Sequence, residues 1–217
     1  MSLANPLGLA AFADGLRIAS TRFTLQFNQE ASLSGGGDRL YADLAPPLWM
    51  ADLATVPMTH AEAKQVIALI NSRAGGLKSF LLYDHSMPYP SSDSDGAIWT
   101  AATPTALVGT VTDRYHLAFT GFPNSYSIPL GTYFQILYDT SRYYLGQFAE
   151  AKTSSGAGAV TAVEVAPILP ASVANGAAVT LMKPSGKFKV VPGTAYAQSI
   201  STVHSTVAFS AMQTMAP

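Results

Sequence analysis

The sequence predicts a mainly β protein with one amphipathic helix, in which a β-sandwich flanked by that helix carries an inserted small β-barrel. Three patterns predict this fold class. Residues 21–28 alternate between apolar and polar, residues 59–70 have the signals of a helix, and residues 107–182 hold short apolar runs at regular intervals. Alternation is the period of a strand, and regularly spaced short strands are typical of small barrels and sandwiches.

The first strand is predicted over residues 21–28, whose leucine and phenylalanine side chains share one side. The glycine cluster Ser34–Gly37 favours a flexible loop, because no Lys-Ser or Lys-Thr step opens a helix after it, as a phosphate-binding loop requires. The chain then runs through Pro46 and Pro47. Neither proline can donate to a β ladder, so any strand there is interrupted or lies at a sheet edge.

One strong helix is predicted from Thr59, where Thr59 and Glu62 form a capping box that satisfies free amides of the first turn. The apolar stripe that follows consists of Ala63, Val66, Ile67 and Ile70. Gly75 and Gly76 are expected to end the helix, because glycine accepts the left-handed conformation found just past a last turn. A strand rich in Phe and Leu is predicted over residues 77–83.

Residues 84–104 are rich in Ser, Asp, Pro and Gly, which predicts a connection with little packing of its own. Six short strands are expected beyond it, at 107–111, 115–119, 132–138, 142–149, 160–165 and 177–182. A terminal pair of strands within residues 187–209 suggests a return to the first unit. We therefore predict a discontinuous first domain, residues 1–97 and 183–217, with residues 98–182 as an inserted barrel; a simple tandem of two domains is the alternative.

The chain is short of charge. Charged residues make up 12% of its 217 residues, against roughly 25% in a typical soluble domain, while hydrophobic residues make up 48%. Such a surface is rich in Ser and Thr or is partly buried against partners. The 12 basic and 13 acidic residues nearly cancel, which disfavours capture of duplex DNA by a basic face. We expect no sequence-specific nucleic acid binding either.

The sequence contains no cysteine, which excludes disulfide bonds, thiolate zinc sites and a cysteine nucleophile. The fold must therefore hold by packing alone. Residues 1–15 lack the basic start and continuous apolar core of a secretion signal, and no run of about 18 apolar residues occurs. We expect a soluble protein made in a cytoplasm, with no membrane insertion.

The residues that could carry chemistry are scattered, so we expect no catalytic residue, no cofactor and no metal site. The histidines lack the spaced partners of a metal-binding helix; they are His60, His85, His116 and His204. The glutamates give no positive support to a catalytic acid pair; they are Glu30, Glu62, Glu150 and Glu164. The segment Asp93-Ser94-Asp95-Gly96 resembles the start of a calcium loop but lacks the later acidic ligands, which favours a turn.

Aromatic residues are dense in the predicted barrel. Alternation places Tyr133 on the face opposite Phe134, and Tyr143 opposite Tyr144, so one set is expected in the core and the other exposed. Exposed tyrosines could stack on sugars or bury in a partner. A carbohydrate-binding module is therefore an alternative function, although cross-strand packing within the domain explains the aromatics more simply.

Several segments together suggest a family. They are Ser32-Leu33-Ser34-Gly35-Gly36 through to Trp49, Met58-Thr59-His60-Ala61-Glu62-Ala63, Gly75-Gly76 and Phe80-Leu81-Leu82-Tyr83-Asp84, with Leu130-Gly131-Thr132-Tyr133-Phe134 and Asn175-Gly176-Ala177-Ala178-Val179 later in the chain. The earlier group resembles the ring-forming domain, and the later pair the inserted barrel, of distal tail proteins. These are tail-tip ring proteins of long-tailed bacteriophages and related gene transfer particles. The resemblance covers most of the sequence, and none of its motifs is chemically unique.

The resemblance implies a structural protein of the virion tail tip with no enzymatic activity. It implies a hexameric ring, assembled in the bacterial host cytoplasm, that joins the tail tube protein to the tail hub protein, or baseplate, and its host-contacting proteins. The inserted barrel is expected on the outside of the ring. The long C-terminal carbohydrate-binding domain of larger relatives is not recognisable in this sequence, which puts direct receptor binding in doubt.

A homo-oligomeric ring needs contacts between unlike surfaces that close by rotation, and open strand edges are often completed by neighbours. The most apolar irregular segment is Pro46, Pro47, Leu48, Trp49 and Met50, which we predict at the subunit interface, with core packing as the alternative. On this hypothesis Trp49→Asp leaves a folded but monomeric protein. A wall-degrading tail enzyme is the least favoured function, because the sequence supplies no nucleophile, metal cluster or convincing acid pair.

Overall fold

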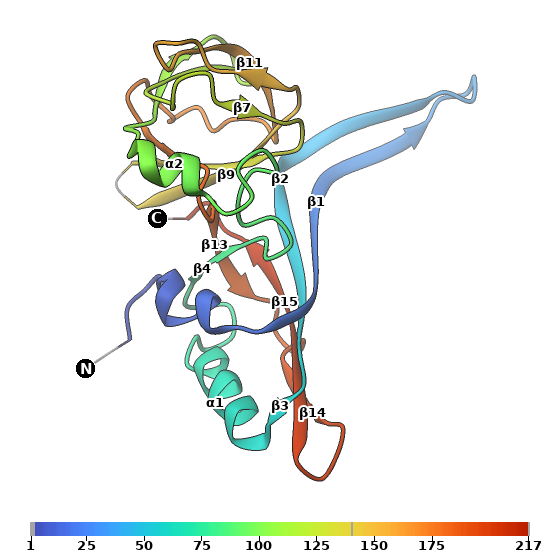
Figure 1. The fold of residues 1–217 in the computed structure, drawn as a ribbon. Coiled ribbons are helices and arrows are strands. Elements are labelled where there is room, and N and C mark those ends of the chain that lie inside the picture. Colours follow the sequence, from blue (N-terminus) through green and yellow to red (C-terminus); the bar gives the residue numbers. More distant parts are fainter. Residues whose placement is uncertain (1–2, 140, 217) are drawn as a thin grey trace.

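The structure is a computed structural model that describes residues 3–139 and 141–216. It confirms the predicted class, because the chain is mainly β, with 46% in strands and 11% in helices. Residues 1–2, 140 and 217, which fall at the ends of the predicted domains or inside the predicted barrel, lie outside the described part. Figure 1 shows a sheet along the height of the molecule, a barrel at one end of it, and a two-stranded hairpin that projects away from both.

One sheet joins the two ends of the chain (Figure 1). Within the described residues its strands are β1 (Ile18–Leu33), β2 (Arg39–Thr55), β3 (Met58–Thr59), β4 (Phe80–Tyr83), β13 (Ser185–Val190), β14 (Tyr196–Ser199) and β15 (His204–Gln213). The main order is β1-β2-β15-β13-β4, and β3 and β14 both pair with β15. The central strand therefore comes from the C-terminal end, and the unit for which we predicted a sandwich is built on this single sheet.

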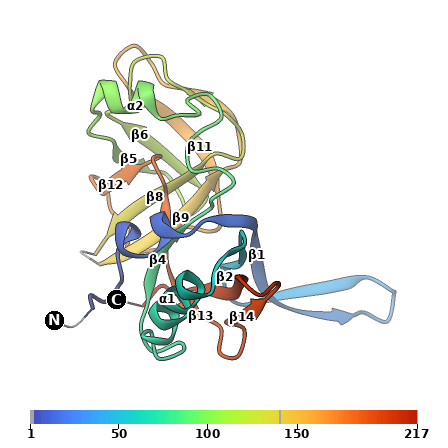
Figure 2. The same ribbon diagram turned by 60° about the horizontal axis from the view of Figure 1, so that its bottom comes forward.

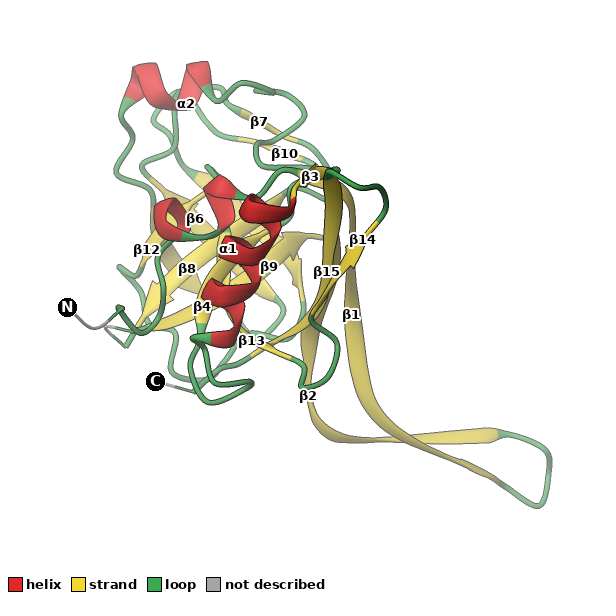
Figure 3. Ribbon diagram, turned by 90° about the horizontal axis from the view of Figure 1, so that it is seen from below, coloured by secondary structure: helices red, strands yellow, loops and turns green. Residues whose placement is uncertain are grey.

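Helix α1 (His60–Asn71) packs against one face of the sheet (Figure 3). Its start confirms the predicted capping box. The hydroxyl Oγ1 of Thr59 accepts a hydrogen bond from the backbone N of Glu62 at 3.3 Å, and the backbone N of Thr59 donates to Glu62 Oε2 at 2.8 Å. The box satisfies amides that have no partner inside the helix, which fixes where the helix begins.

The helix ends at Asn71, earlier than the predicted stop at Gly75. Ala74 and Gly75 both have positive φ, 52° and 64°, so the left-handed conformation predicted for glycine already begins at an alanine. In the same turn Arg73 is 1% exposed, and its Nη1 donates to the carbonyl of Ala4 at 2.9 Å. This buried contact ties the turn to the N-terminal segment, so the chain leaves the helical path before the glycines.

The N-terminal segment completes the core on the same side of the sheet. Phe12 lies between the short helices η1 (Leu9–Ala11) and η2 (Ala13–Gly15), and its ring packs against Phe80 and Phe209 at centroid distances of 4.9 and 5.9 Å. Leu7 forms a parallel bridge with Phe80, so this segment also covers the edge of β4. The segment and α1 together supply the layer that a second sheet supplies in a sandwich.

The second unit is a ring of strands with its own core (Figure 2). In the described residues six strands close in the order β11-β6-β5-β12-β8-β9. They are β5 (Leu107–Val111), β6 (His116–Thr120), β8 (Tyr133–Tyr138), β9 (Arg142–Phe148), β11 (Val160–Ala166) and β12 (Ala178–Thr180), and β7 (Ser127–Ile128) pairs separately with β10 (Lys152–Thr153). Phe119, Phe134 and Phe148 pack together inside the ring.

The connection between the two units packs more than its composition predicted, and here the prediction is wrong. It contains helix α2 (Ala97–Ala102), and Asp93 and Trp99 are only 3% and 7% exposed. The Asp93 carboxylate accepts hydrogen bonds from the backbone N of Ile98 at 3.1 Å and of Trp99 at 2.9 Å. It also accepts one from the Tyr126 hydroxyl at 3.2 Å. Asp93 therefore stabilises the first turn of α2 and holds Trp99 in the barrel core.

The barrel packs against the sheet through β8 and β9. This contact corrects the prediction that one set of the alternating barrel aromatics is exposed. Tyr133 and Phe134 are both buried, although they point to opposite faces of β8. The outward ring of Tyr133 packs edge-on against Trp49 of β2 at a centroid distance of 5.4 Å, and burial raises the pKa of Tyr133 to about 12. The indole Nε1 of Trp49 donates to the carbonyl of Leu145 in β9 at 2.8 Å. Trp49 thus joins the two units.

This position changes the expected effect of Trp49→Asp. Because Trp49 is 4% exposed and lies inside the joint, the substitution leaves a cavity and buries an unpaired carboxylate. We expect it to lower the free energy of unfolding by at least about 3 kcal/mol, rather than to give a stable monomer. Urea unfolding followed by tryptophan and tyrosine fluorescence measures this. The matched control is Met50→Asp, next along β2 but on the partly exposed face, and an equal loss in both variants would contradict the assignment.

Candidate functional site: the hairpin arm and its groove

The outer part of the first hairpin projects from the molecule as an arm, which we define as residues 27–45 (Figure 1, Figure 3). Its two strands stay paired up to Leu33 and Arg39. At the tip, Ser34 N donates to the carbonyl of Asp38 at 2.8 Å and Asp38 N donates to Ser34 Oγ at 3.1 Å, while Gly37 takes a φ of 88°. The glycine cluster predicted as a flexible loop is therefore a hydrogen-bonded hairpin turn.

The arm bends away from the sheet at two irregularities, both in β2. Between the pairs Gln26↔Leu48 and Asn28↔Ala45, one β1 residue faces both Pro46 and Pro47. Between Asn28↔Ala45 and Gln29↔Asp43, Leu44 is the extra residue. Extra residues in one strand bend a β ladder, and prolines are tolerated at such bulges because they cannot donate. The interruption predicted from the proline pair is present, and it directs the arm away from the barrel (Figure 1).

The arm exposes large apolar side chains that nothing in the described chain covers. Its exposed hydrophobic residues are Phe27 (60%), Leu33 (73%), Leu40 (59%), Tyr41 (62%) and Leu44 (68%). A two-stranded ribbon has no interior, so these side chains cannot be buried within the arm itself. Clusters of exposed apolar side chains of this kind mark surfaces that bind partners.

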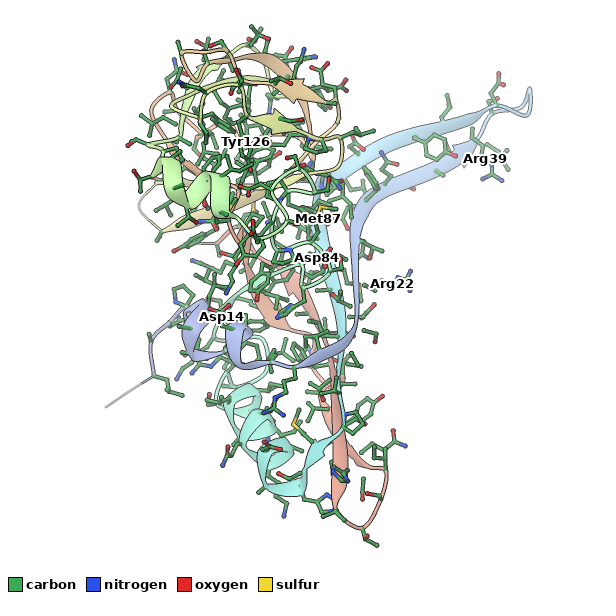
Figure 4. All side chains as sticks on the ribbon, viewed as in Figure 1. Asp14, Arg22, Arg39, Asp84, Met87 and Tyr126 are labelled. Atoms are coloured by element: carbon green, nitrogen blue, oxygen red, sulfur yellow. The ribbon has the colours of Figure 1, made fainter. Side chains whose placement is uncertain are left out.

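The face of the arm that continues the core side of the sheet is the one turned towards the barrel. The residues Phe27, Gln29 and Leu33 follow Leu25 at alternate positions of β1, and Gln29 donates from Nε2 to Asp43 Oδ1 at 2.6 Å across the ladder. On the same face Leu33 opposes Arg39. Figure 4 shows Arg39 near the end of the arm, far from the barrel. None of the ion pairs in the described chain involves this guanidinium.

A groove of about 540 Å³ separates the root of the arm from the barrel. Phe27, Asp43 and Leu44 line it from the arm, and Tyr115, Glu164 and Ile168 from the barrel. Arg114 also lines it, but its Nε already donates to the carbonyl of Leu169 at 3.0 Å. The described side chains form no ion pair with Asp43 or Glu164. The groove is therefore mostly apolar, with two carboxylates that form no ion pair, one of which, Asp43, already accepts a hydrogen bond from Gln29.

The residues of the predicted interface segment, Pro46 to Met50, differ in their burial. Trp49 is core, which removes it from any interface, whereas Pro46 is exposed and Pro47, Leu48 and Met50 are partly exposed. Pro46 and Pro47 also line the groove. The surface that sequence reasoning missed is the arm beyond them. The alternation of residues 21–28 stops at Gln29 and Glu30, so the sequence carries no clear signal for the outer part of the hairpin.

The histidines lie apart and have local roles. The His60 ring bonds to Ser205 Oγ at 2.7 Å and to the carbonyl of Thr202 at 3.0 Å, and His85 bonds to the carbonyl of Ala13 at 3.0 Å. His116 pairs with Asp113 at 2.9 Å, and His204 lies beside Ser201. Across residues 3–139 and 141–216, no three His, Cys, Asp or Glu side chains gather in a way that could hold a metal ion.

The barrel tyrosines are mostly buried. Tyr126, Tyr133, Tyr138 and Tyr144 are all at most 9% exposed, and Tyr143 is half-buried. Tyr115, at 51%, is the one with a largely exposed ring, and it lies in the groove. The barrel surface therefore does not offer the row of exposed tyrosines on which the carbohydrate-binding alternative depends.

A polar cluster lies near the junction of the two units, around Asp14 (Figure 4). The Nζ of Lys183 donates to Asp14 Oδ1 at 2.7 Å, and the Tyr83 hydroxyl donates to the same oxygen at 3.2 Å. The hydrogen bond from Lys183 holds the pKa of Asp14 below its ordinary value and raises the pKa of Lys183. Lys183 follows the last barrel strand, so this pair fastens the chain where it leaves the barrel.

Comparison with known proteins gives no assignment: no protein-family model matches this chain, and no curated protein is similar to it at a significant level. In the part of the chain that the structure describes, the helices are too short or too polar to cross a membrane.

The Asp14–Lys183 pair predicts a pH dependence of stability. Because the folded-state pKa of Asp14 is lowered, its contribution is present above the unfolded-state pKa and is lost as the pH falls through the folded pKa. Both side chains are about one-third exposed, so Asp14→Asn should cost less than about 1 kcal/mol at neutral pH. The difference from the parent should fade as the pH falls below 3.8, the ordinary pKa of an aspartate carboxyl group. Urea unfolding across this range measures it, with Asp38→Asn as the control, and a deficit that grows in acid would contradict the pairing.

Proposed function

We propose that this chain is a structural subunit of a bacteriophage tail tip, a distal tail protein. In this proposal it assembles in the bacterial host cytoplasm into a ring, six-membered by the family resemblance. The ring joins the tail tube protein to the tail hub and the host-contacting proteins. The observation that carries the proposal is the projecting arm, because its exposed apolar residues need a partner that the single chain does not contain.

The unpaired strand edges support the same role. In the described residues β1 pairs only with β2, and β15 reaches β2 only from Met50 to Ala54, so both edges of the arm are free of ladder partners. Free edges of this length are covered in proteins that remain soluble, usually by another element or another subunit. A ring of identical subunits provides such cover at every position.

The placement of the barrel is consistent with a ring subunit that carries an inserted unit. The sheet combines strands from residues 18–83 with strands from 185–213, while the barrel strands come from residues 107–180. The barrel therefore leaves the sheet and returns to it at one place, at the end away from α1 (Figure 1). Such a unit can face outward from a ring whose contacts are made by the sheet, the arm and the side of the barrel next to the arm.

Removal of the apolar side chains of the arm tests the proposal. The variant Leu33→Ser/Leu40→Ser/Leu44→Ser should fold as the parent does, because all three side chains are at least 59% exposed. It should raise the dissociation constant of the oligomer by about a hundredfold or more, since each leucine buried in a contact contributes about 1.5 kcal/mol or more. Size-exclusion chromatography with light scattering measures this, and negative-stain images of the parent should show sixfold rings.

The matched control removes as much exposed apolar surface elsewhere. Leu77→Ser/Ile98→Ser/Leu130→Ser changes side chains that are 80%, 53% and 64% exposed and lie outside the arm. It should leave the oligomer intact. A parent protein that stays monomeric at every concentration, in solution and in its native particle, would remove the proposed function. An arm variant that still forms rings would remove the role of the arm.

A further inference from the structure

The groove between the arm and the barrel has a lining that indicates what kind of segment could bind there. Its lining is mostly apolar and carries the carboxylates of Asp43 and Glu164, neither of which forms an ion pair in the described chain. Arg114 is the one basic side chain of the lining, and its Nε is already bonded to the Leu169 carbonyl. An extended apolar segment with one basic side chain fits this chemistry. The tip of the arm has that composition. Leu33 and Arg39 oppose each other on one face of the ribbon, Leu40 lies on the other face, and the Arg39 guanidinium forms none of the ion pairs of the described chain.

The tip cannot fill the groove of its own chain. The groove lies at the root of the arm and reaches as far as Gln29, whereas Arg39 lies at the far end of an unbroken ladder from Gln29 to Leu33. At about 3.3 Å per residue, this ladder separates the tip from the groove by roughly 13 Å. A paired two-stranded ladder of this length cannot fold back on itself without breaking its hydrogen bonds. Any arm tip in the groove therefore belongs to another copy.

We propose that the groove of one subunit receives the arm tip of a second copy of this chain, with Arg39 of the tip beside Asp43 and Glu164 of the groove. This inference rests on the proposed ring and specifies its contact. Each subunit then offers one tip and one groove, which are different surfaces, so the contact is heterologous and repeats from one subunit to the next. The apolar side chains of the tip are buried against Phe27, Leu44 and Ile168 of the neighbour.

Cysteine cross-linking tests this contact sharply, because the chain has no cysteine of its own. Leu40→Cys and Ile168→Cys are prepared as separate proteins, mixed so that subunits exchange, and oxidised. A disulfide-linked dimer should form in the mixture and in neither protein alone. The double variant Leu40→Cys/Ile168→Cys should give a covalent ladder that ends at the ring size. Denaturing gel electrophoresis without reductant measures both.

The matched control pairs Leu40→Cys with Leu130→Cys, an exposed leucine of the barrel that does not line the groove. This mixture should give no specific dimer. Rings in which Leu40→Cys links to Leu130→Cys, or to itself, would overturn the docking while leaving the ring proposal intact. Rings in which Leu40→Cys forms no disulfide with Ile168→Cys would likewise overturn the docking and leave the ring proposal intact. A monomeric parent would overturn both.

A charge exchange gives a second, independent readout. Arg39→Glu should weaken the oligomer by about tenfold, because it places a third carboxylate in the groove. Glu164→Arg alone should also weaken it, by bringing two guanidinium groups together. The combination Arg39→Glu/Glu164→Arg should recover most of the loss, measured by light scattering across a dilution series. Simple additivity of the two losses would contradict direct contact between these residues.

Discussion

A two-stranded ribbon has no interior, and this constraint governs how the chain can be stable and soluble. The apolar side chains of residues 27–45 can be buried only by something outside the ribbon. The rest of the fold does the opposite, because the sheet and the barrel each bury a core, and Tyr133 and Leu145 of the barrel complete the core of the sheet. The molecule is therefore a self-sufficient body attached to one element that is not self-sufficient, and its function is best sought at that element.

The joint at Trp49 determines what the arm faces. On the core side of β2, Trp49 packs on Tyr133 and donates to the carbonyl of Leu145, which fixes the barrel against the sheet. Two to five residues before it along the same strand, the bulges at Pro47, Pro46 and Leu44 bend the arm outward. One short stretch of β2 thus fixes both walls of the groove. Its width follows from covalent and packing constraints rather than from the flexibility of a loop.

Much of the local structure could be predicted from the sequence, because local signals determine it. The capping box of Thr59 and Glu62 and the six barrel strands are encoded by neighbouring residues, and their bounds were close to those observed. The failures share a cause, which is contact between distant segments. Tyr133 is buried on its outward face by Trp49, and Arg73, in the turn that follows the early helix end, bonds to the distant Ala4. Alternation and glycine position carry no information on such contacts.

Only part of the candidate site could be predicted from the sequence, again because contacts between distant segments determine the rest. The segment of residues 46–50 is apolar and irregular, and both a core and an interface contain such segments. Alternation along β2 separates them once the strand is known, because Trp49 points to the core while Met50 points away. The arm itself was hidden by its glycine-rich tip. Four polar or glycine residues read equally well as a loose loop and as the turn of a hairpin.

In the proposed assembly, the geometry of one contact determines how the subunits close into a ring. A heterologous contact leaves one tip and one groove unsatisfied at the ends of any open row of subunits, and only closure of the row removes both. The angle between successive subunits is set by the bend of the arm relative to the barrel, hence by the bulges and by Trp49. The number of subunits in a closed ring is then a property of these few residues of β2, and not of the extent of the surfaces that meet.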